Sequence, residues 1–305
     1  MDRTLETRLR QAGALASLPN VAMRVVALAH DPDVEAEPLL DEIQHDPPMT
    51  ARVLRAANSV LYNHPRRITN LRQALVVMGT KGITHVALGF SLRGLMQPPG
   101  SSPDFWRRSV YAALVGRELA HRLAPLAVED VFVAALLQDL GILALEQALP
   151  ADYARIVAGC DGHAARAAAE RAALGTDHAE VGAWLLGQWG LPELLIEAVA
   201  RSHDPRGVAP ARRTLVHCVA ASGVIADLWL DADHEAATER AWLAGDVWLG
   251  LDTEVLSGVL ETVDRRLPDM MALFDLEAVD PAQLDAVLAA ARELLPHYAV
   301  SHGGR

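Results

Sequence analysis

Residues 131–145 read VFVAALLQDLGILAL, an apolar run in which only Gln138 and Asp139 carry polar side chains. The composition predicts a buried helix. A buried amide and carboxylate are unfavourable unless they have partners or a task, so function should be sought around Asp139. His178 opens one predicted helix and His203 closes the next, which would bring both imidazoles toward Asp139. Two histidines and one aspartate are suitable ligands for a divalent metal.

Length and composition limit the class of protein. The chain has 305 residues, of which 51% are hydrophobic, and can bury a large core. Charged residues break the apolar runs before bilayer length and no signal peptide is recognisable, so we expect a soluble cytoplasmic protein without a membrane segment. Cys160 and Cys218 form no CxxC pair, which argues against a disulfide scaffold or a thiolate zinc site. The net charge of -12 repels a phosphate backbone, so no nucleic-acid partner is expected.

Apolar residues recur at helical spacing along almost the whole chain, and the alternation typical of strands is scarce. The sequence therefore predicts an all-α fold. For an N-terminal helical bundle in residues 1–97, the expected helices are 2–12, one that starts after Pro19, 38–44, 48–59, 71–78 and 81–95. Residues 97–103, QPPGSSP, have the composition of a linker.

A second helical region is predicted over residues 104–230, and a C-terminal helical extension over residues 231–305. Besides the central helix, the expected helices of both regions are 105–123, an alanine-rich helix at 164–173, one opened by His178, 192–203, 212–229, 234–250, 252–264 and 281–297. Asp177 followed by Glu180 has the pattern of a capping box, which places His178 in a first helical turn.

Several separated motifs resemble a known family. In the first region these motifs are Asp46-Pro47, Leu54-Arg55, Ala57-Asn58-Ser59, Tyr62 and Gly79, and in the second they are Phe105-Trp106, Gln138-Asp139, His178 and His203. Together, over roughly residues 10 to 205, they are similar to the HDOD family, the HD-related output domains of bacterial signalling proteins. The second region resembles the HD phosphohydrolases, in which an adjacent histidine and aspartate bind metal.

The resemblance implies a degenerate site. The first histidine of the family pattern falls at Arg108 and the second at Gln138, while the closing aspartate falls at Ala220. Asp139, His178 and His203 match. Asp227, nearly two helical turns beyond Ala220, is a doubtful substitute. A permanent cation at Arg108 repels a divalent metal, and an amide is a weak ligand, so we expect no metal, no cofactor and no catalysis.

The expected binding residues are therefore the remnant set Arg108, Gln138, Asp139, His178 and His203. We expect Arg108 to pair with Asp139, Gln138 to bridge, and the two histidines to donate to carboxylates or backbone. The resemblance implies a non-catalytic signalling adaptor that binds a protein partner or a regulatory ligand. Two alternatives remain: a metal-dependent phosphohydrolase or phosphodiesterase with unusual ligands, and a nucleotide sensor in which Arg108 and the histidines grip a phosphate.

Overall fold

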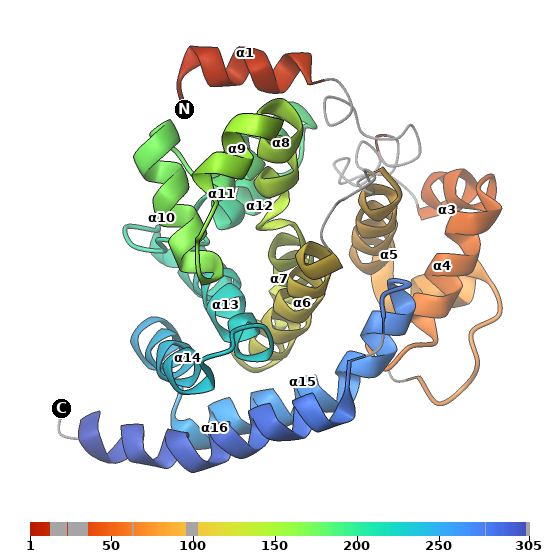
Figure 1. Cartoon of the computed structure of the whole chain (residues 1–305). Helices are drawn as coiled ribbons and strands as arrows, with labels where there is room; N and C mark the ends of the chain where they lie inside the picture. The colour runs from red at the N-terminus through yellow and green to blue at the C-terminus, as the bar shows by residue number, and fades with distance from the viewer. Residues whose placement is uncertain (13–22, 24–35, 63, 96–102, 278, 303–305) are drawn as a thin grey trace.

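The computed structural model describes residues 1–12, 23, 36–62, 64–95, 103–277 and 279–302. Helices and turns make up these ranges, which contain no strand, so the all-α prediction is confirmed (Figure 1). The helix predicted after Pro19 and residues 97–102 of the predicted linker lie outside the described residues.

The N-terminal bundle consists of α3 (Ala36–Gln44), α4 (Pro47–Ala57) and α5 (Leu71–Leu95). Asp46 caps α4 by accepting a hydrogen bond from the backbone N–H of Met49 at 3.0 Å. At the other end of α4, the Asn58 amide both accepts from and donates to the backbone of Ile68, at 2.8 Å in each case. Asn58 therefore fixes the connection between α4 and α5.

Gly79 divides α5 into the two segments that the sequence predicts, since its φ of 69° is non-helical. Leu71–Arg93 is nevertheless long and apolar enough to cross a membrane, contrary to the expectation that every apolar run is too short. However, 67% of an apolar 18-residue window in that segment is buried inside the protein, and α5 packs against α4, α3 and α7. Such burial is typical of a core helix.

The second region is built around helices that pack on α13. Its elements are α6 (Pro103–Leu123), α7 (Val128–Leu137), α8 (Leu140–Ala148), α9 (Pro150–Ile156), α10 (Gly162–Leu174), α11 (His178–Gln188), α12 (Glu193–Ala200) and α13 (Pro210–Ala226). The predicted continuous central helix was wrong in one respect: it is two helices, because the backbone of Asp139 leaves helical geometry at φ -98° and ψ 5°. The break turns the chain so that α8 packs against α11 while α7 packs against α6 and α13.

The C-terminal helices α14 (His234–Leu249), α15 (Thr253–Leu273) and α16 (Pro281–His302) cover this core. Figure 1 shows α15 and α16 running along its lower side, and α15 reaching the N-terminal bundle. There the backbone oxygen of Phe274 accepts a hydrogen bond from Arg93 Nε at 2.9 Å. The C-terminal extension therefore joins both of the preceding regions.

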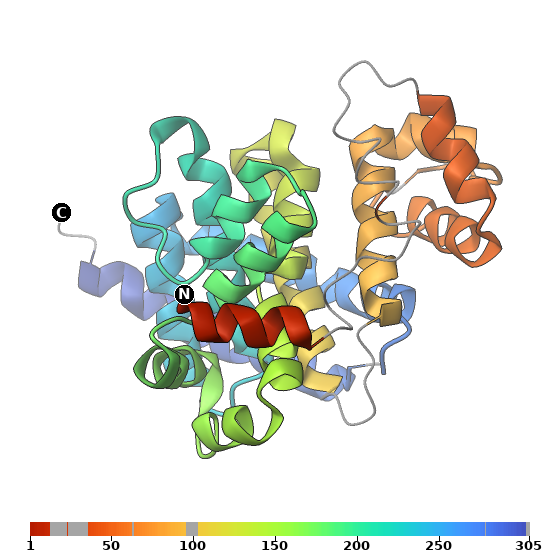
Figure 2. The same ribbon diagram turned by 90° about the horizontal axis from the view of Figure 1, so that it is seen from above.

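The first helix, α1 (Arg3–Gln11), packs on α8. Figures 1 and 2 show it away from the N-terminal bundle, in which its position in the sequence had placed it.

A buried arginine connects the N-terminal bundle to the core. Arg117 on α6 donates to Glu129 Oε1 at 2.6 Å and to the backbone oxygen of Leu61 at 3.0 Å. Tyr62 donates to the other oxygen of Glu129 at 3.1 Å. The two regions thus share a polar network.

Candidate functional site

Asp139 lies at the break between α7 and α8, and only 1% of its surface is exposed. One carboxylate oxygen, Oδ2, accepts a hydrogen bond from Arg108, so the predicted pair is present. The other oxygen, Oδ1, is buried and has no hydrogen-bond partner. A buried carboxylate oxygen without a donor is unfavourable, which indicates that a hydrogen-bond donor or a cation belongs beside it.

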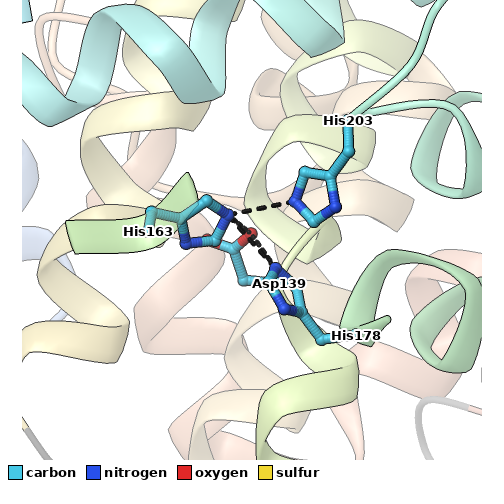
Figure 3. A group of neighbouring side chains, drawn as sticks. All are labelled: Asp139, His163, His178 and His203. Carbon is cyan, nitrogen blue, oxygen red and sulfur yellow. Dashed lines mark hydrogen bonds and ion pairs between the residues drawn. The ribbon is translucent and has the colours of Figure 1, made fainter. Parts of the chain in front are cut away.

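Three histidines converge on this free oxygen (Figure 3). His163 lies in the first turn of α10, His178 is the first residue of α11, and His203 follows the end of α12. The Nε2 atom of His163 lies 3.1 Å from Nε2 of His178 and 3.1 Å from Nε2 of His203. Asp139 Oδ1 is 3.5 Å from His163 Nε2 and 3.7 Å from His178 Nε2. Together the four residues offer ligand atoms that all lie within 4.8 Å of one another.

Carboxylates contact the Nδ1 atoms of two of the three imidazole rings, on the side away from the cluster. His178 Nδ1 lies 2.6 Å from Glu170 Oε2, and His203 Nδ1 lies 2.9 Å from Asp177 Oδ2. A proton on each Nδ1 makes these contacts hydrogen bonds, and it leaves the Nε2 lone pairs directed into the cluster. Glu170 is itself fixed by the hydroxyl of Tyr153 at 2.5 Å. Carboxylates that orient imidazoles in this way are characteristic of histidine ligands to metals.

The protonation of His163 limits the hydrogen bonds that the cluster can make. Burial and the positive charge of Arg108 hold the pKa of His163 well below its ordinary value, so the ring is neutral. A neutral His163 carries at most one proton on Nε2 and cannot donate to both neighbouring Nε2 atoms. With a single proton on each of His178 and His203, placed at Nδ1, at least one of the two 3.1 Å contacts brings two lone pairs together. A metal ion would remove this repulsion and satisfy Asp139 Oδ1.

The donor set suits a metal ion. Three imidazole nitrogens and one carboxylate oxygen match the preferences of zinc and of other first-row divalent ions. The expectation of no metal was based on Arg108, Gln138 and Ala220, and it did not include His163. The geometry instead favours a site for a single cation on Asp139, His163, His178 and His203.

Arg108 occupies the opposite side of Asp139. Besides that carboxylate, its guanidinium donates to Asp227 Oδ1 at 2.9 Å and to the backbone oxygen of Gly223 at 2.9 Å. Burial lowers the pKa of Arg108, but the two carboxylates outweigh it and raise that pKa above its ordinary value. Asp227, which the sequence made a doubtful substitute, is therefore part of the site as a partner of Arg108.

Gln138 does not bridge Arg108 and Asp139 by a hydrogen bond among the described residues, which corrects the predicted network. Its amide nitrogen donates to the backbone oxygen of Ala135 at 3.1 Å, within its own helix. Its amide oxygen lies so close to Gly223 that a Cβ added there would be 2.7 Å away. Gln138 therefore fills space between α7 and α13.

His163 is the residue that sequence reasoning missed. It immediately precedes the predicted alanine-rich helix 164–173, whereas α10 begins at Gly162. One signal was available. Like His178 and His203, His163 lies at a helix end, and the alanine-rich helix that follows it has few other side chains that could bind a ligand.

Two cavities adjoin the cluster from different sides. A cavity of about 480 Å³ is lined by Arg107, Arg108, Asp139, His163 and Arg166, among others. A second one, of about 560 Å³, is lined by His203 and by residues that include Arg201 and Arg206. One cavity therefore borders Asp139 and His163, and the other borders His203.

Substituting Gly141 by alanine is expected to disturb the site through the contact of α8 with α11. An added Cβ would lie 2.0 Å from the backbone oxygen of His178 and 2.7 Å from the nitrogen of Gly182, so the helices must separate. Overpacking of this kind costs about 1–3 kcal/mol and occasionally more. Denaturant unfolding measures it. Gly187→Ala, on the same α11 with only Ile196 3.8 Å away, is the control and should be neutral or stabilising. Equal effects of the two changes would contradict this account.

Comparison with known proteins agrees with this architecture. The sequence matches the HDOD domain over residues 15–205. An HDOD domain protein of unknown function from Geobacter sulfurreducens is 24% identical, with a TM-score of 0.65, covering 88% of this chain and 98% of its own. A Shewanella amazonensis protein provisionally named a phosphohydrolase is 21% identical, with a TM-score of 0.61, covering 96% of this chain and 98% of its own.

Two further relatives differ from this chain in length. A Marinobacter aquaeolei protein, provisionally named a signal transduction protein, is 20% identical with a TM-score of 0.64, covering 93% of this chain and 62% of its own. An uncharacterised Treponema pallidum protein is 20% identical over 209 residues, which are 68% of this chain. The match spans 41% of that relative's length.

Proposed function

Since the chain belongs to the HDOD domain family, we propose that it is a non-catalytic signal-transduction protein that binds one metal cation and acts through a protein partner. The cation would be held by Asp139, His163, His178 and His203. The name of the Marinobacter aquaeolei protein, which shares the fold, supports a role in signalling.

The position of Arg108 is the observation that supports a single cation and a non-catalytic role. A site with two metal ions needs anionic ligands for both, and here the second oxygen of Asp139 and the carboxylate of Asp227 bind the guanidinium instead. Arg108 supplies a fixed positive charge on that side of Asp139. The residues present therefore fit one cation and disfavour a second.

The number of protein donors also favours a non-catalytic role. Catalytic zinc sites keep a coordination position for water, whereas structural sites use four protein ligands. Three imidazoles and the Asp139 carboxylate would supply four protein ligands to a zinc ion. When bound, such a cation supplies charge that holds together the α7–α8 break, α10, α11 and the segment after α12. Because these segments are far apart in the sequence, cation binding should stabilise the fold.

A regulatory anion is the second candidate, and Arg107 and Arg166 favour it. Both line the cavity beside His163, and Arg107 Nε is buried without a hydrogen-bond partner, although Glu146, Asp161 and Asp231 line the same cavity. Arg108 lines the same cavity, but each of its three nitrogens already donates to Asp139, Asp227 or Gly223. A phosphate-sensing role would therefore depend on Arg107 and Arg166.

The protein is expected to show no phosphodiester hydrolysis. The substrates are bis(p-nitrophenyl) phosphate and cyclic dinucleotides, each supplied with manganese, iron or zinc. The control is His163→Ala, which removes a cation ligand. Wild type and variant should both match the uncatalysed rate. Turnover by wild type that disappears in His163→Ala would make the protein an enzyme and refute the proposal.

A further inference from the structure

A groove lies between α14 and the connection from α12 to α13, outside the histidine cluster. Its volume is about 560 Å³, and Pro205, Val208, Val247 and Trp248 give it apolar walls. Val247 is 69% exposed, although it is a large aliphatic residue on a helix. Leu243, one turn earlier on α14, is 38% exposed and extends the apolar face. Exposed apolar residues that adjoin in this way are typical of an interaction surface.

The charged residues of this groove are all basic. Arg206 and Arg213 line it, and no carboxylate does among the described residues. This is unusual in a chain whose net charge is -12. Arg213 has no ion pair among the described residues, and Arg206 is paired only with Asp204, in a pair whose arginine is 85% exposed. Exposed pairs of this kind exchange readily for another carboxylate, because they contribute little to stability.

We propose that this groove, defined by Pro205, Arg206, Val208, Arg213, Val247 and Trp248, binds an acidic peptide segment of a partner protein. The inference rests on the proposed function and names the chemistry of the partner. Apolar side chains of the peptide would contact Val247 and Trp248, while its carboxylates would pair with Arg206 and Arg213. Two arginines in a largely apolar groove offer few contacts to a continuous phosphate backbone, which disfavours an oligonucleotide as the occupant.

The groove is connected to the candidate metal site by a short segment of chain. His203 supplies one Nε2 atom to the cluster, and Pro205 lies two residues later in the wall of the groove. The adjoining cavity is lined by both His203 and Arg206. A peptide that changes the position of this segment would also change the cation affinity, and linkage requires that the cation change peptide affinity by the same factor.

Fluorescence anisotropy with a labelled short peptide of Asp, Glu, Leu and Trp tests the proposal, and the control peptide carries Lys in place of the acidic residues. The whole 305-residue chain should bind the acidic peptide, more weakly as salt rises. Val247→Asp and Arg213→Glu should each weaken binding by about tenfold or more. The matched controls are Val76→Asp and Arg67→Glu, which are exposed positions on and before α5, and these should bind as wild type does.

Several results would overturn the inference. The first is that the acidic peptide does not bind the wild type, and the second is that the lysine peptide binds it equally well. The third is that the groove variants Val247→Asp and Arg213→Glu bind the acidic peptide as tightly as the wild type does. If an oligonucleotide displaces the peptide, the groove binds nucleic acid instead. If sedimentation shows a dimer of the wild type and a monomer of Val247→Asp, the groove binds a second copy of this chain. The same preparations are assayed for phosphodiester hydrolysis. Turnover would refute the proposed function, whereas no turnover together with no groove binding would remove only the groove proposal.

Discussion

Replacing Arg108 by methionine is expected to lower the free energy of unfolding by about 3 to 5 kcal/mol, because the change strands buried carboxylates. The guanidinium donates to Asp139, to Asp227 and to the backbone oxygen of Gly223. Methionine fills a similar volume but satisfies none of these acceptors. Urea unfolding, followed by circular dichroism in the presence of a chelator, measures the loss without a contribution from bound metal.

A double-mutant cycle shows whether the loss comes from the pair. Arg108→Met combined with Asp227→Leu should cost much less than the two single changes summed, since the double variant removes a charge together with its partner. Arg206→Met removes an arginine whose ion pair is solvent-exposed, and it should leave stability unchanged. Additive costs in the cycle would show that Arg108 and Asp227 do not stabilise each other.

Removing the cation is expected to destabilise the wild type, and His163→Ala should abolish the difference. A ligand that binds only the folded state at about a thousandfold its dissociation constant adds about 4 kcal/mol. His163 lies 3.1 Å from each of the other two imidazole nitrogens, so its loss opens the cluster at the centre. Thermal unfolding with zinc and then with EDTA measures the effect in both proteins.

The control for this experiment is His64→Ala, an exposed histidine in the N-terminal bundle whose Nδ1 lies 2.9 Å from the backbone oxygen of Arg66. It should keep the full difference between zinc and EDTA. Identical unfolding of wild type with zinc and with EDTA would mean that the four residues bind no cation.

The all-α fold was predictable because its determinants are local. Helical periodicity, proline positions and capping residues mark most helix ends, and Asp177 indeed caps α11 by accepting from Glu180 N–H at 3.0 Å. The break at Asp139 was not predicted, since apolar residues continue through it without a glycine or proline at the break itself. Its cause is tertiary: α8 must turn to pack closely on α11.

The site was predicted in part. Asp139, His178 and His203 do converge, and Arg108 does pair with Asp139. His163 was not recognised, and Asp227 was named only as a doubtful ligand. Their contributions depend on how α10 and α13 cross the core, which the spacing of residues in the sequence does not predict. Gly141 and Gly182 illustrate the difficulty. The close approach of α8 and α11 at these two glycines positions His178, yet each glycine alone looks like an ordinary small residue.

The central claim is that Asp139 and three histidines hold one cation while Arg108 prevents a second. Elemental analysis of protein purified without chelators, compared with His163→Ala prepared in the same way, tests it most directly. The account predicts a single equivalent of zinc, iron or manganese per wild-type chain and a large loss of it in the variant. Two equivalents in the wild type, or none in protein incubated with these metals and then desalted, would contradict it.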